Sequence, residues 1–314
     1  MRRALQLARN GEGRVSPNPM VGAVIVHEGR IIGEGFHAFY GGPHAEVNAI
    51  RSIKDKDRHL LNASVIYVTL EPCAHHGKTP PCANLIVDTG IPRVMIGSPD
   101  PNPLVAGKGI SILEKAGIKV TQGILEKECR ELNRRFMHAQ VSDRPYIQLK
   151  WAQSADGFMA ATDENNDPKA MKFSTPVSSV WMHRARAHVD AIMVGGNTDR
   201  IDNPRLDTRL WGGNSPKKFV AHYADEKLLT DRLRQMRHDG ITSLMVEGGH
   251  ILFDSFFHEG LYDEIRIETS PHILGKGLPA PFLPSDMVLA DSFFSGDNLI
   301  QEFRRRNSQD VKKA

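Results

Sequence analysis

The most constraining feature of the sequence is a set of metal-binding side chains placed at the ends of predicted helices and strands. His44 and Glu46 flank one small residue at the start of a predicted helix, a β-branched run at Val65–Leu70 is followed by Cys73, and Cys82 opens the next helical pattern. One imidazole and two thiolates suit a tetrahedral zinc ion and leave its fourth position open for water. The sequence therefore predicts a zinc site with ligands His44, Cys73 and Cys82, and with Glu46 unbound.

This ligand set predicts a hydrolytic reaction. Zinc lowers the pKa of a bound water to about 7. Glu46 can then move protons between that water and a substrate, provided that it does not bind the metal itself. The order His-x-Glu, Pro-Cys and Cys is typical of the zinc deaminases that act on nucleobases and nucleosides. The alternative to a zinc site is that His44 is a hydrogen-bonded histidine of the core and that Cys73 and Cys82 are buried apolar residues. That alternative does not explain the order of these residues along the chain.

Length and composition favour a globular chain of two domains. At 314 residues the chain exceeds the usual size of one domain. The net charge is +3 with acidic and basic residues interspersed, which does not indicate a nucleic-acid partner. Three cysteines are too few for a disulfide scaffold and suit a reducing compartment. Because no secretory signal or apolar run of about 18 residues is present, we expect a cytoplasmic protein without membrane partners.

The alternation of strands and helices predicts two α/β domains. Residues 1–143 follow the order β-β-α-β-α-β-α, which favours a three-layer domain with a mostly parallel sheet. Ser142–Pro145 is the predicted boundary, because proline discourages continuation of the preceding helix. Residues 144–306 repeat the alternation, and residues 307–314 form a charged tail. The predicted strands are Val21–Val26, Arg30–Phe36, Val65–Leu70, Arg93–Gly97, Tyr146–Trp151, Ala191–Gly195, Ser243–Glu247 and Asp263–Thr269. The predicted helices include Gly109–Ala116, Lys127–Gln140, Pro176–Ala187, Thr230–His238 and His250–Glu259.

Several polar residues of the first half are candidates for binding a substrate. Asn18 can hold the polar edge of a ring, although asparagine next to proline is also common in turns. Asp100 and Asn102 follow the last strand of the first domain, where α/β domains bind ligands, and they are equally plausible as turn formers. The segment between the two cysteines is long and basic, which suits a phosphate on the substrate. Its candidate donors are His76, Lys78 and Thr79.

Residues of the second half give weaker indications. No G-x-G-x-x-G motif follows a strand, so a Rossmann nucleotide site is not indicated. The glycine pairs Gly195-Gly196 and Gly248-Gly249 let a backbone approach a phosphate, but ordinary turns explain them as well. Arg186 and Arg209 can each bind a phosphate with both arms of the guanidinium group, although each alone is more often a surface residue. Lys150 and Glu247 lie near the ends of predicted central strands, where a charged side chain needs a partner or a chemical role.

Eight sequence blocks, four in each half, are shared with one enzyme family. They are Ser16–Val26, His44–Glu46, Thr69–Cys82, Asp100–Gly109, Gln148–Gly157, Arg184–Thr198, Asp202–Arg209 and Val246–Gly249. In these blocks the chain resembles the bifunctional riboflavin-biosynthesis deaminase/reductases over nearly its full length. The resemblance implies a cytidine-deaminase-like first domain and a dihydrofolate-reductase-like second domain. It also implies zinc-dependent deamination of 2,5-diamino-6-ribosylamino-4(3H)-pyrimidinone 5′-phosphate, followed by NADPH-dependent reduction of the ribosyl group to ribityl.

The same resemblance assigns roles in the second domain. Lys150 and Glu247 would orient the sugar during hydride transfer from the nicotinamide. The implied substrate contacts are Arg186, Leu206, Arg209 and Glu247. The implied NADPH contacts are Ala152, Thr198, Asp202, Gly248, Gly249, His250, Ile251 and Leu252.

Two departures from the family pattern leave an alternative open. Ala170–Phe173 lacks the tryptophan that the family usually has, and Lys217–Lys227 is short for the strands that hold the adenosine of the cofactor. A deaminase with a degenerate, non-reducing second domain is therefore the alternative. A non-enzymatic zinc-binding protein and a nucleic-acid base editor are further alternatives. The sequence shows no sign of the basic, aromatic-lined channel that a base editor needs, which argues against the latter. Because domains of this type often pair, we expect a homodimer or homotetramer that acts on a small molecule.

Overall fold

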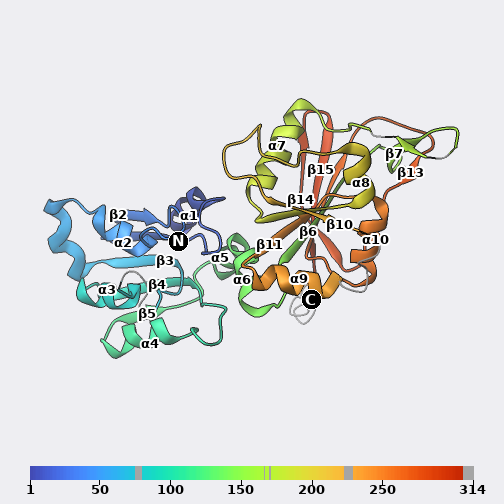
Figure 1. Cartoon of the computed structure of the whole chain (residues 1–314). Coiled ribbons are helices and arrows are strands. Elements are labelled where there is room, and N and C mark those ends of the chain that lie inside the picture. Colours follow the sequence, from blue (N-terminus) through green and yellow to red (C-terminus); the bar gives the residue numbers. More distant parts are fainter. Residues whose placement is uncertain (75–79, 166, 170, 223–228, 307–314) are drawn as a thin grey trace. The chain divides into compact units, whose positions relative to one another are not determined.

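The computed structural model describes residues 1–74, 80–165, 167–169, 171–222 and 229–306 (Figure 1). The chain divides into two compact units, Met1–Ser142 and Asp143–Ala314, and each is described by itself. The candidate phosphate donors His76, Lys78 and Thr79 lie outside the described residues, as does the tail 307–314. No helix within the described ranges is long and apolar enough to cross a membrane.

The first unit is built on a five-stranded sheet with the order β2-β1-β3-β4-β5. Its strands are β1 (Gly22–His27), β2 (Arg30–Phe36), β3 (Val65–Leu70), β4 (Arg93–Ser98) and β5 (Lys119–Thr121). Its helices are α1 (Arg2–Ala8), η1 (Arg9–Gly11), α2 (Ala45–Arg51), η2 (Asp55–Ala63), α3 (Cys82–Asp88), α4 (Lys108–Lys115), α5 (Glu126–Leu132) and α6 (Arg134–Val141). Strand β1 is antiparallel to β2 and β3, whereas β3, β4 and β5 are parallel.

Apolar helix faces cover both sides of this sheet. Ala49 of α2, Ile86 of α3 and Leu113 of α4 are fully buried in one cluster with residues of the central strands. On the other face, Leu7 of α1 packs against Val24 of β1. The first unit therefore has three layers, as the sequence predicts, and the amino ends of α2 and α3 carry His44 and Cys82.

The single helix predicted at Lys127–Gln140 is wrong, because the structure has two helices that meet at Asn133. Asn133 is only 3% exposed. Its side-chain amide accepts a hydrogen bond from the Met20 N–H and donates one to the Met20 carbonyl, each at 2.8 Å. Asparagine has low helix propensity because its side chain competes for backbone partners. Here that side chain fixes the segment that leads into β1.

The second unit is built on a seven-stranded sheet with the order β10-β9-β11-β6-β12-β15-β14. Its strands are β6 (Tyr146–Gln153), β9 (Ala191–Gly195), β10 (Lys217–Ala221), β11 (Ser243–Val246), β12 (Glu264–Thr269), β14 (Met287–Ser295) and β15 (Asn298–Arg305). Its helices are α7 (Pro176–Ala187), α8 (Gly196–Asp202), α9 (Leu229–His238) and α10 (His250–His258). The five strands β10, β9, β11, β6 and β12 are parallel to one another. Strand β15 is antiparallel to β12, and β14 is antiparallel to β15.

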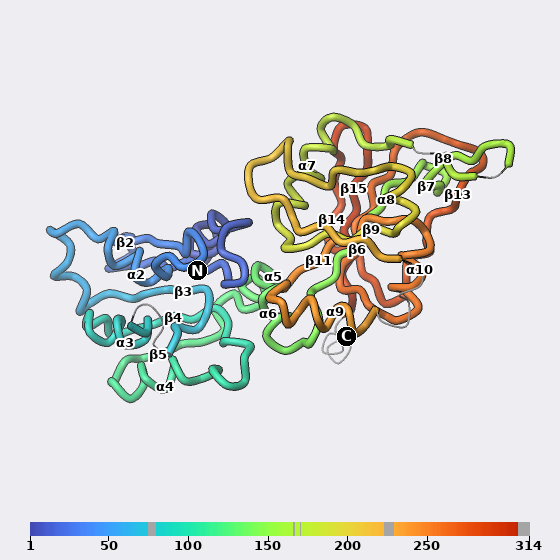
Figure 2. Tube along the Cα trace, viewed as in Figure 1, coloured from blue at the N-terminus to red at the C-terminus, as the bar shows by residue number. Residues whose placement is uncertain are grey.

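Helices α9 and α10 cover one face of this sheet, and α7 covers the other. Phe253 and Phe256 of α10 are fully buried in a cluster that contains Trp151 of β6. Met182 of α7 packs on the opposite face against Met245 of β11. A small sheet joins β7 (Phe158–Thr162) to the nearby β8 (Pro168–Lys169) and to β13 (Leu278–Pro279), which is distant in sequence but lies beside β7 in Figure 2.

Candidate active sites

The three predicted zinc ligands lie together in the first unit. His44 precedes the first turn of α2, Cys73 follows β3, and Cys82 is the first residue of α3. The Nδ1 atom of His44 lies 3.2 Å from Cys82 Sγ and 3.5 Å from Cys73 Sγ. All three ligand atoms lie within 4.8 Å of one another. Tetrahedral zinc places a nitrogen and a sulfur ligand about 3.5 Å apart, so this group of side chains fits the ion.

The two thiols have opposite proton affinities. Hydrogen bonding from the Cys82 thiol, together with the Cys82 backbone N–H at 3.3 Å, lowers the pKa of Cys73 to about 4 despite burial. The thiolate of Cys73 and burial raise the pKa of Cys82. At neutral pH Cys73 is therefore a thiolate, whereas Cys82 keeps its own proton. Because zinc binds thiolates, binding of the ion would release this remaining proton.

Glu46 lies beside this group without belonging to it. The residue is in the first turn of α2 and is 3% exposed. Burial, and then the negative charge of Cys73, raise the pKa of Glu46 to about 7, whereas an ordinary glutamate titrates near 4.5. A carboxyl group with a pKa close to neutrality can both accept and donate a proton, which is the property that a proton shuttle requires.

Asn18 is held by His37, a residue that the sequence analysis did not single out. His37 Nδ1 lies 3.0 Å from the Pro43 carbonyl, and His37 Nε2 lies 3.1 Å from Asn18 Nδ2. Because a carbonyl can only accept, Nδ1 carries the proton and Nε2 accepts from the Asn18 amide. Burial lowers the pKa of His37, which agrees with a neutral ring. The ring also contacts His44 edge-on at 5.5 Å between centroids, so the loop that carries Asn18 is fixed beside a zinc ligand.

Glu71 is a second residue that sequence reasoning missed. Its carboxylate is 5% exposed and accepts backbone N–H groups of Asp100 at 3.2 Å, Gly107 at 3.0 Å and Gly109 at 3.0 Å. The segment after β4 is thereby attached to the segment that carries Cys73. The sequence feature that could have identified Glu71 is its position at the end of a buried strand, where a charged side chain needs hydrogen-bond partners.

Asp100 and Asn102 have the turn-forming roles that the sequence left open. Asp100 Oδ1 accepts the Asn102 N–H at 2.8 Å, and Asn102 Oδ1 accepts the Leu104 N–H at 3.0 Å. These bonds stabilise consecutive turns. Contact of the two side chains with a substrate remains a prediction.

Replacing Gly109 with alanine should destabilise the first unit. The added Cβ atom would lie 1.9 Å from the Pro72 carbonyl oxygen and 3.3 Å from Glu71 Oε1, so the backbone must move. We expect a loss of about 1–3 kcal/mol in the free energy of unfolding, the usual cost of overpacking. Chemical denaturation measures this loss. The control is Gly212→Ala, where the added atom meets open space; equal effects of both substitutions would contradict the prediction.

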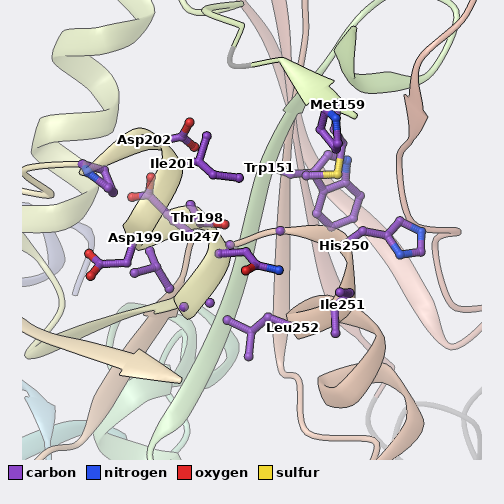
Figure 3. A pocket seen from close by; sticks show the side chains of 18 of the residues that line it. Trp151, Met159, Thr198, Asp199, Ile201, Asp202, Glu247, His250, Ile251 and Leu252 are labelled. Atoms are coloured by element: carbon purple, nitrogen blue, oxygen red, sulfur yellow. The ribbon is translucent and has the colours of Figure 1, made fainter. Parts of the chain in front are cut away.

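The second unit contains a cavity of about 1040 Å³ at the carboxyl ends of its parallel strands. In Figure 3, Asp199, Ile201 and Asp202 lie on one side of this pocket, and His250 and Ile251 lie on another. Twelve of the predicted reductase-site residues line it: Lys150, Ala152, Arg186, Thr198, Asp202, Leu206, Glu247, Gly248, Gly249, His250, Ile251 and Leu252. Arg209 is not among the lining residues; it is half exposed and pairs with Asp207 at 2.5 Å.

The glycines at this pocket lie close to side chains of the neighbouring helices. A Cβ atom on Gly248 would lie 2.8 Å from Leu252 Cδ2 and 3.3 Å from the Gly195 nitrogen. A Cβ atom on Gly249 would lie 3.2 Å from Thr198 Oγ1. Close packing therefore favours small residues at both positions without a ligand, although the two side chains could move to admit a Cβ atom.

Arg186 and Glu247 form a bidentate ion pair in the pocket. Arg186 Nε and Nη2 each lie 2.8 Å from a different carboxylate oxygen of Glu247. Burial alone would raise the pKa of Glu247, but the charges of Arg186 and Lys150 hold it below its usual range. The remaining arm, Nη1, donates to the Asp207 carbonyl at 3.4 Å. In this structure the Arg186 guanidinium group therefore binds protein oxygens on both sides instead of being directed at a phosphate.

Comparison with known proteins shows which family each unit belongs to. Residues 1–98 match the family model of the cytidine and deoxycytidylate deaminase zinc-binding region, and residues 145–231 and 226–290 match the RibD C-terminal domain. The riboflavin biosynthesis protein RibD of Escherichia coli (strain K12) is 42% identical over 353 residues, covering 93% of this chain and 92% of the relative. The chain belongs to the RibD family. The RibD of Aquifex aeolicus (strain VF5) is 37% identical, with 88% of each chain covered.

Solved RibD structures have the same fold over the whole length. A diaminohydroxyphosphoribosylaminopyrimidine deaminase/5-amino-6-(5-phosphoribosylamino)uracil reductase from Thermotoga maritima matches with a TM-score of 0.85, at 34% identity and 97% coverage of each chain. Acinetobacter baumannii RibD matches with a TM-score of 0.84, at 29% identity and 98% coverage. The predicted fold classes, the predicted enzyme classes and the role in riboflavin biosynthesis are confirmed. A degenerate second domain is not favoured, because the RibD C-terminal domain is present.

Proposed function

We propose that this RibD-family protein deaminates 2,5-diamino-6-ribosylamino-4(3H)-pyrimidinone 5′-phosphate in residues 1–143 and reduces the ribosyl group of the product with NADPH in residues 144–306. The main support is the convergence of His44, Cys73 and Cys82 around a space for zinc, with Glu46 beside them. The Thermotoga maritima relative is named for both reactions. The proposal includes a cytoplasmic homodimer or homotetramer whose partner is a small molecule.

Glu46 carries the proton transfers of the deamination. Zinc, when bound, supplies an activated water, and the net reaction exchanges a ring-bound amine for an oxygen with release of ammonia. Glu46 accepts a proton from the water and delivers protons to the ring nitrogen and the departing amine. The neutral His37 ring holds the Asn18 amide, which binds the polar edge of the pyrimidine. The proposed phosphate donors are His76, Lys78 and Thr79, and Asp100 and Asn102 border the substrate.

The pocket of the second unit binds the cofactor and the sugar. NADPH, when bound, supplies the hydride. Lys150 and Glu247 lie on the pocket wall and orient the sugar carbon that is reduced. Arg186, Leu206 and Arg209 are the proposed substrate contacts. The proposed cofactor contacts are Ala152, Thr198, Asp202, Gly248, Gly249, His250, Ile251 and Leu252.

Removal of zinc should separate the two reactions. Dialysis against dipicolinate is expected to reduce ammonia release to background, because the bound water is no longer activated. Oxidation of NADPH with the deaminated substrate should continue, since the reductase pocket contains no residue of the metal group. Ammonia assays and NADPH absorbance measure the two activities. Re-addition of zinc should restore deamination, and persistence of ammonia release in zinc-free protein would contradict the metal assignment. A protein that releases ammonia but never oxidises NADPH would refute the reductase half.

A further inference from the structure

One face of strand β12 carries buried charges that extend to the reductase pocket. Glu264, Arg266 and Glu268 are 1%, 6% and 2% exposed. Because alternate residues of a strand point to the same side, the three side chains share one face of the sheet. Strand β6 runs parallel to β12 with Lys150 paired to Arg266. Lys150 therefore lies on this same face, diagonal to Glu268 and within reach of its long side chain.

The other carboxylates of this face have arginine partners. Glu264 lies 3.4 Å from Arg304, and Glu302 lies 3.5 Å from Arg266. The residue of β15 opposite Glu268 is Ile300, which carries no charge. Across the described ranges, no basic side chain comes within the 4.0 Å ion-pair distance of Glu268.

Lys150 is the cation that balances Glu268. Burial alone would raise the pKa of Glu268, yet the Lys150 charge, with hydrogen bonds from neighbouring side chains, holds it below its usual value. The second carboxylate near Lys150 is Glu247, and both of its oxygens are bound by Arg186. Glu268 is buried whereas Lys150 is only partly buried. A buried charge without a counter-ion is costly, so Lys150, which Glu247 does not neutralise, is the counter-charge available to Glu268.

Glu268 also holds the pocket wall. Its carboxylate accepts hydrogen bonds from Ser174 Oγ at 2.8 Å and Asn298 Nδ2 at 2.6 Å. The same Asn298 amide donates to the Phe173 carbonyl at 3.0 Å. Phe173 lines the cavity, and it lies in the segment where the family tryptophan is missing. One carboxylate thus connects the lysine of the pocket to a residue of its wall.

We propose that Glu268 is a positioning residue of the reductase site, the counter-ion that keeps the Lys150 ammonium in place and fixes the segment carrying Phe173. Glu268 itself is not among the residues that line the cavity, whereas Lys150 and Phe173 are. The proposal rests on the reductase function proposed above.

Competitive acetylation of the full chain tests the charge interaction without any enzyme assay. Acetic anhydride reacts more slowly with an amine that a counter-ion holds in place than with a free one. In Glu268→Gln, Lys150 is expected to react about tenfold faster than in the unsubstituted protein, relative to exposed Lys276, as judged by mass spectrometry. The matched control is Glu302→Gln, which removes a carboxylate paired with arginines and should leave the Lys150 rate unchanged. Equal Lys150 rates in all three proteins would overturn the proposal.

Steady-state kinetics test whether Glu268 supports the reduction reaction. In Glu268→Gln the kcat for NADPH oxidation should fall about tenfold, as expected for loss of one charge interaction in a water-poor site, while the KM for NADPH changes little. Glu268→Asp should recover part of the loss. A loss of stability alone, with kcat of the folded fraction unchanged, would overturn the proposal. If the unsubstituted protein does not oxidise NADPH, the proposed function fails, and the acetylation rates still decide whether Glu268 balances Lys150.

Discussion

Replacing Glu46 with glutamine is expected to stop ammonia release while zinc stays bound. Glutamine keeps the shape of the side chain but cannot accept or donate the transferred protons. Glu46 is 3% exposed and lies outside the ligand group, so the zinc ligands are unchanged. Since general acid–base catalysis contributes about 10²–10⁴-fold, kcat should fall by that factor.

Ammonia release and metal analysis of the same preparation measure both parts of this result. Glu114→Gln, at an exposed position on α4, is the control for removing a carboxylate from this unit. Deamination that survives in Glu46→Gln would show that another group moves the protons. Loss of zinc from Glu46→Gln would show instead that the carboxylate supports the metal.

Replacing Glu247 with leucine should destabilise the second unit and abolish reduction. The substitution leaves the Arg186 guanidinium, only 13% exposed, without its bidentate partner. Breaking a buried ion pair from one side typically costs about 3–5 kcal/mol. Reduction should be lost as well, because the group proposed to orient the sugar is gone.

A double substitution separates these two effects. In Arg186→Met/Glu247→Leu both charges are replaced by apolar groups, so much of the lost stability should return. NADPH oxidation should remain absent. Thermal denaturation and NADPH absorbance provide the two measurements. A double variant as unstable as Glu247→Leu would contradict the ion-pair explanation, and recovery of reduction would contradict the role of Glu247.

Local signals explain which elements could be predicted from the sequence. The helix Pro176–Ala187 has its predicted bounds because Thr175 and Ser178 exchange side-chain and backbone hydrogen bonds at its start, and proline fits the first turn. Strand Arg30–Phe36 also has its predicted bounds, following the turn at Glu28 and Gly29. Strands β14 and β15 were not predicted, because β14 is an exposed edge and β15 places Glu302 and Arg304 in a buried charged face.

The two sites differ in how far sequence could define them. The zinc ligands could be predicted because they lie at the ends of short helices and strands, and local sequence patterns identify those ends. The pairing of Arg186 with Glu247 joins residues 61 positions apart, and the bond of Glu268 to Ser174 joins residues 94 positions apart. Such partners depend on strand order in the sheet. Charged and apolar residues alternate strictly from Glu264 to Glu268 along β12. This pattern predicts a strand whose charged side faces solvent, so it gives no sign that these charges are buried.

The attachment of Glu71 to the segment after β4 has a consequence for variation among relatives. One carboxylate binds the backbone at Asp100, before the loop, and at Gly107 and Gly109, after it. Insertions or deletions within 101–106 therefore leave both anchor points and the start of α4 in register. We expect length differences in this loop to leave the fold of the first unit intact as long as Glu71 is retained.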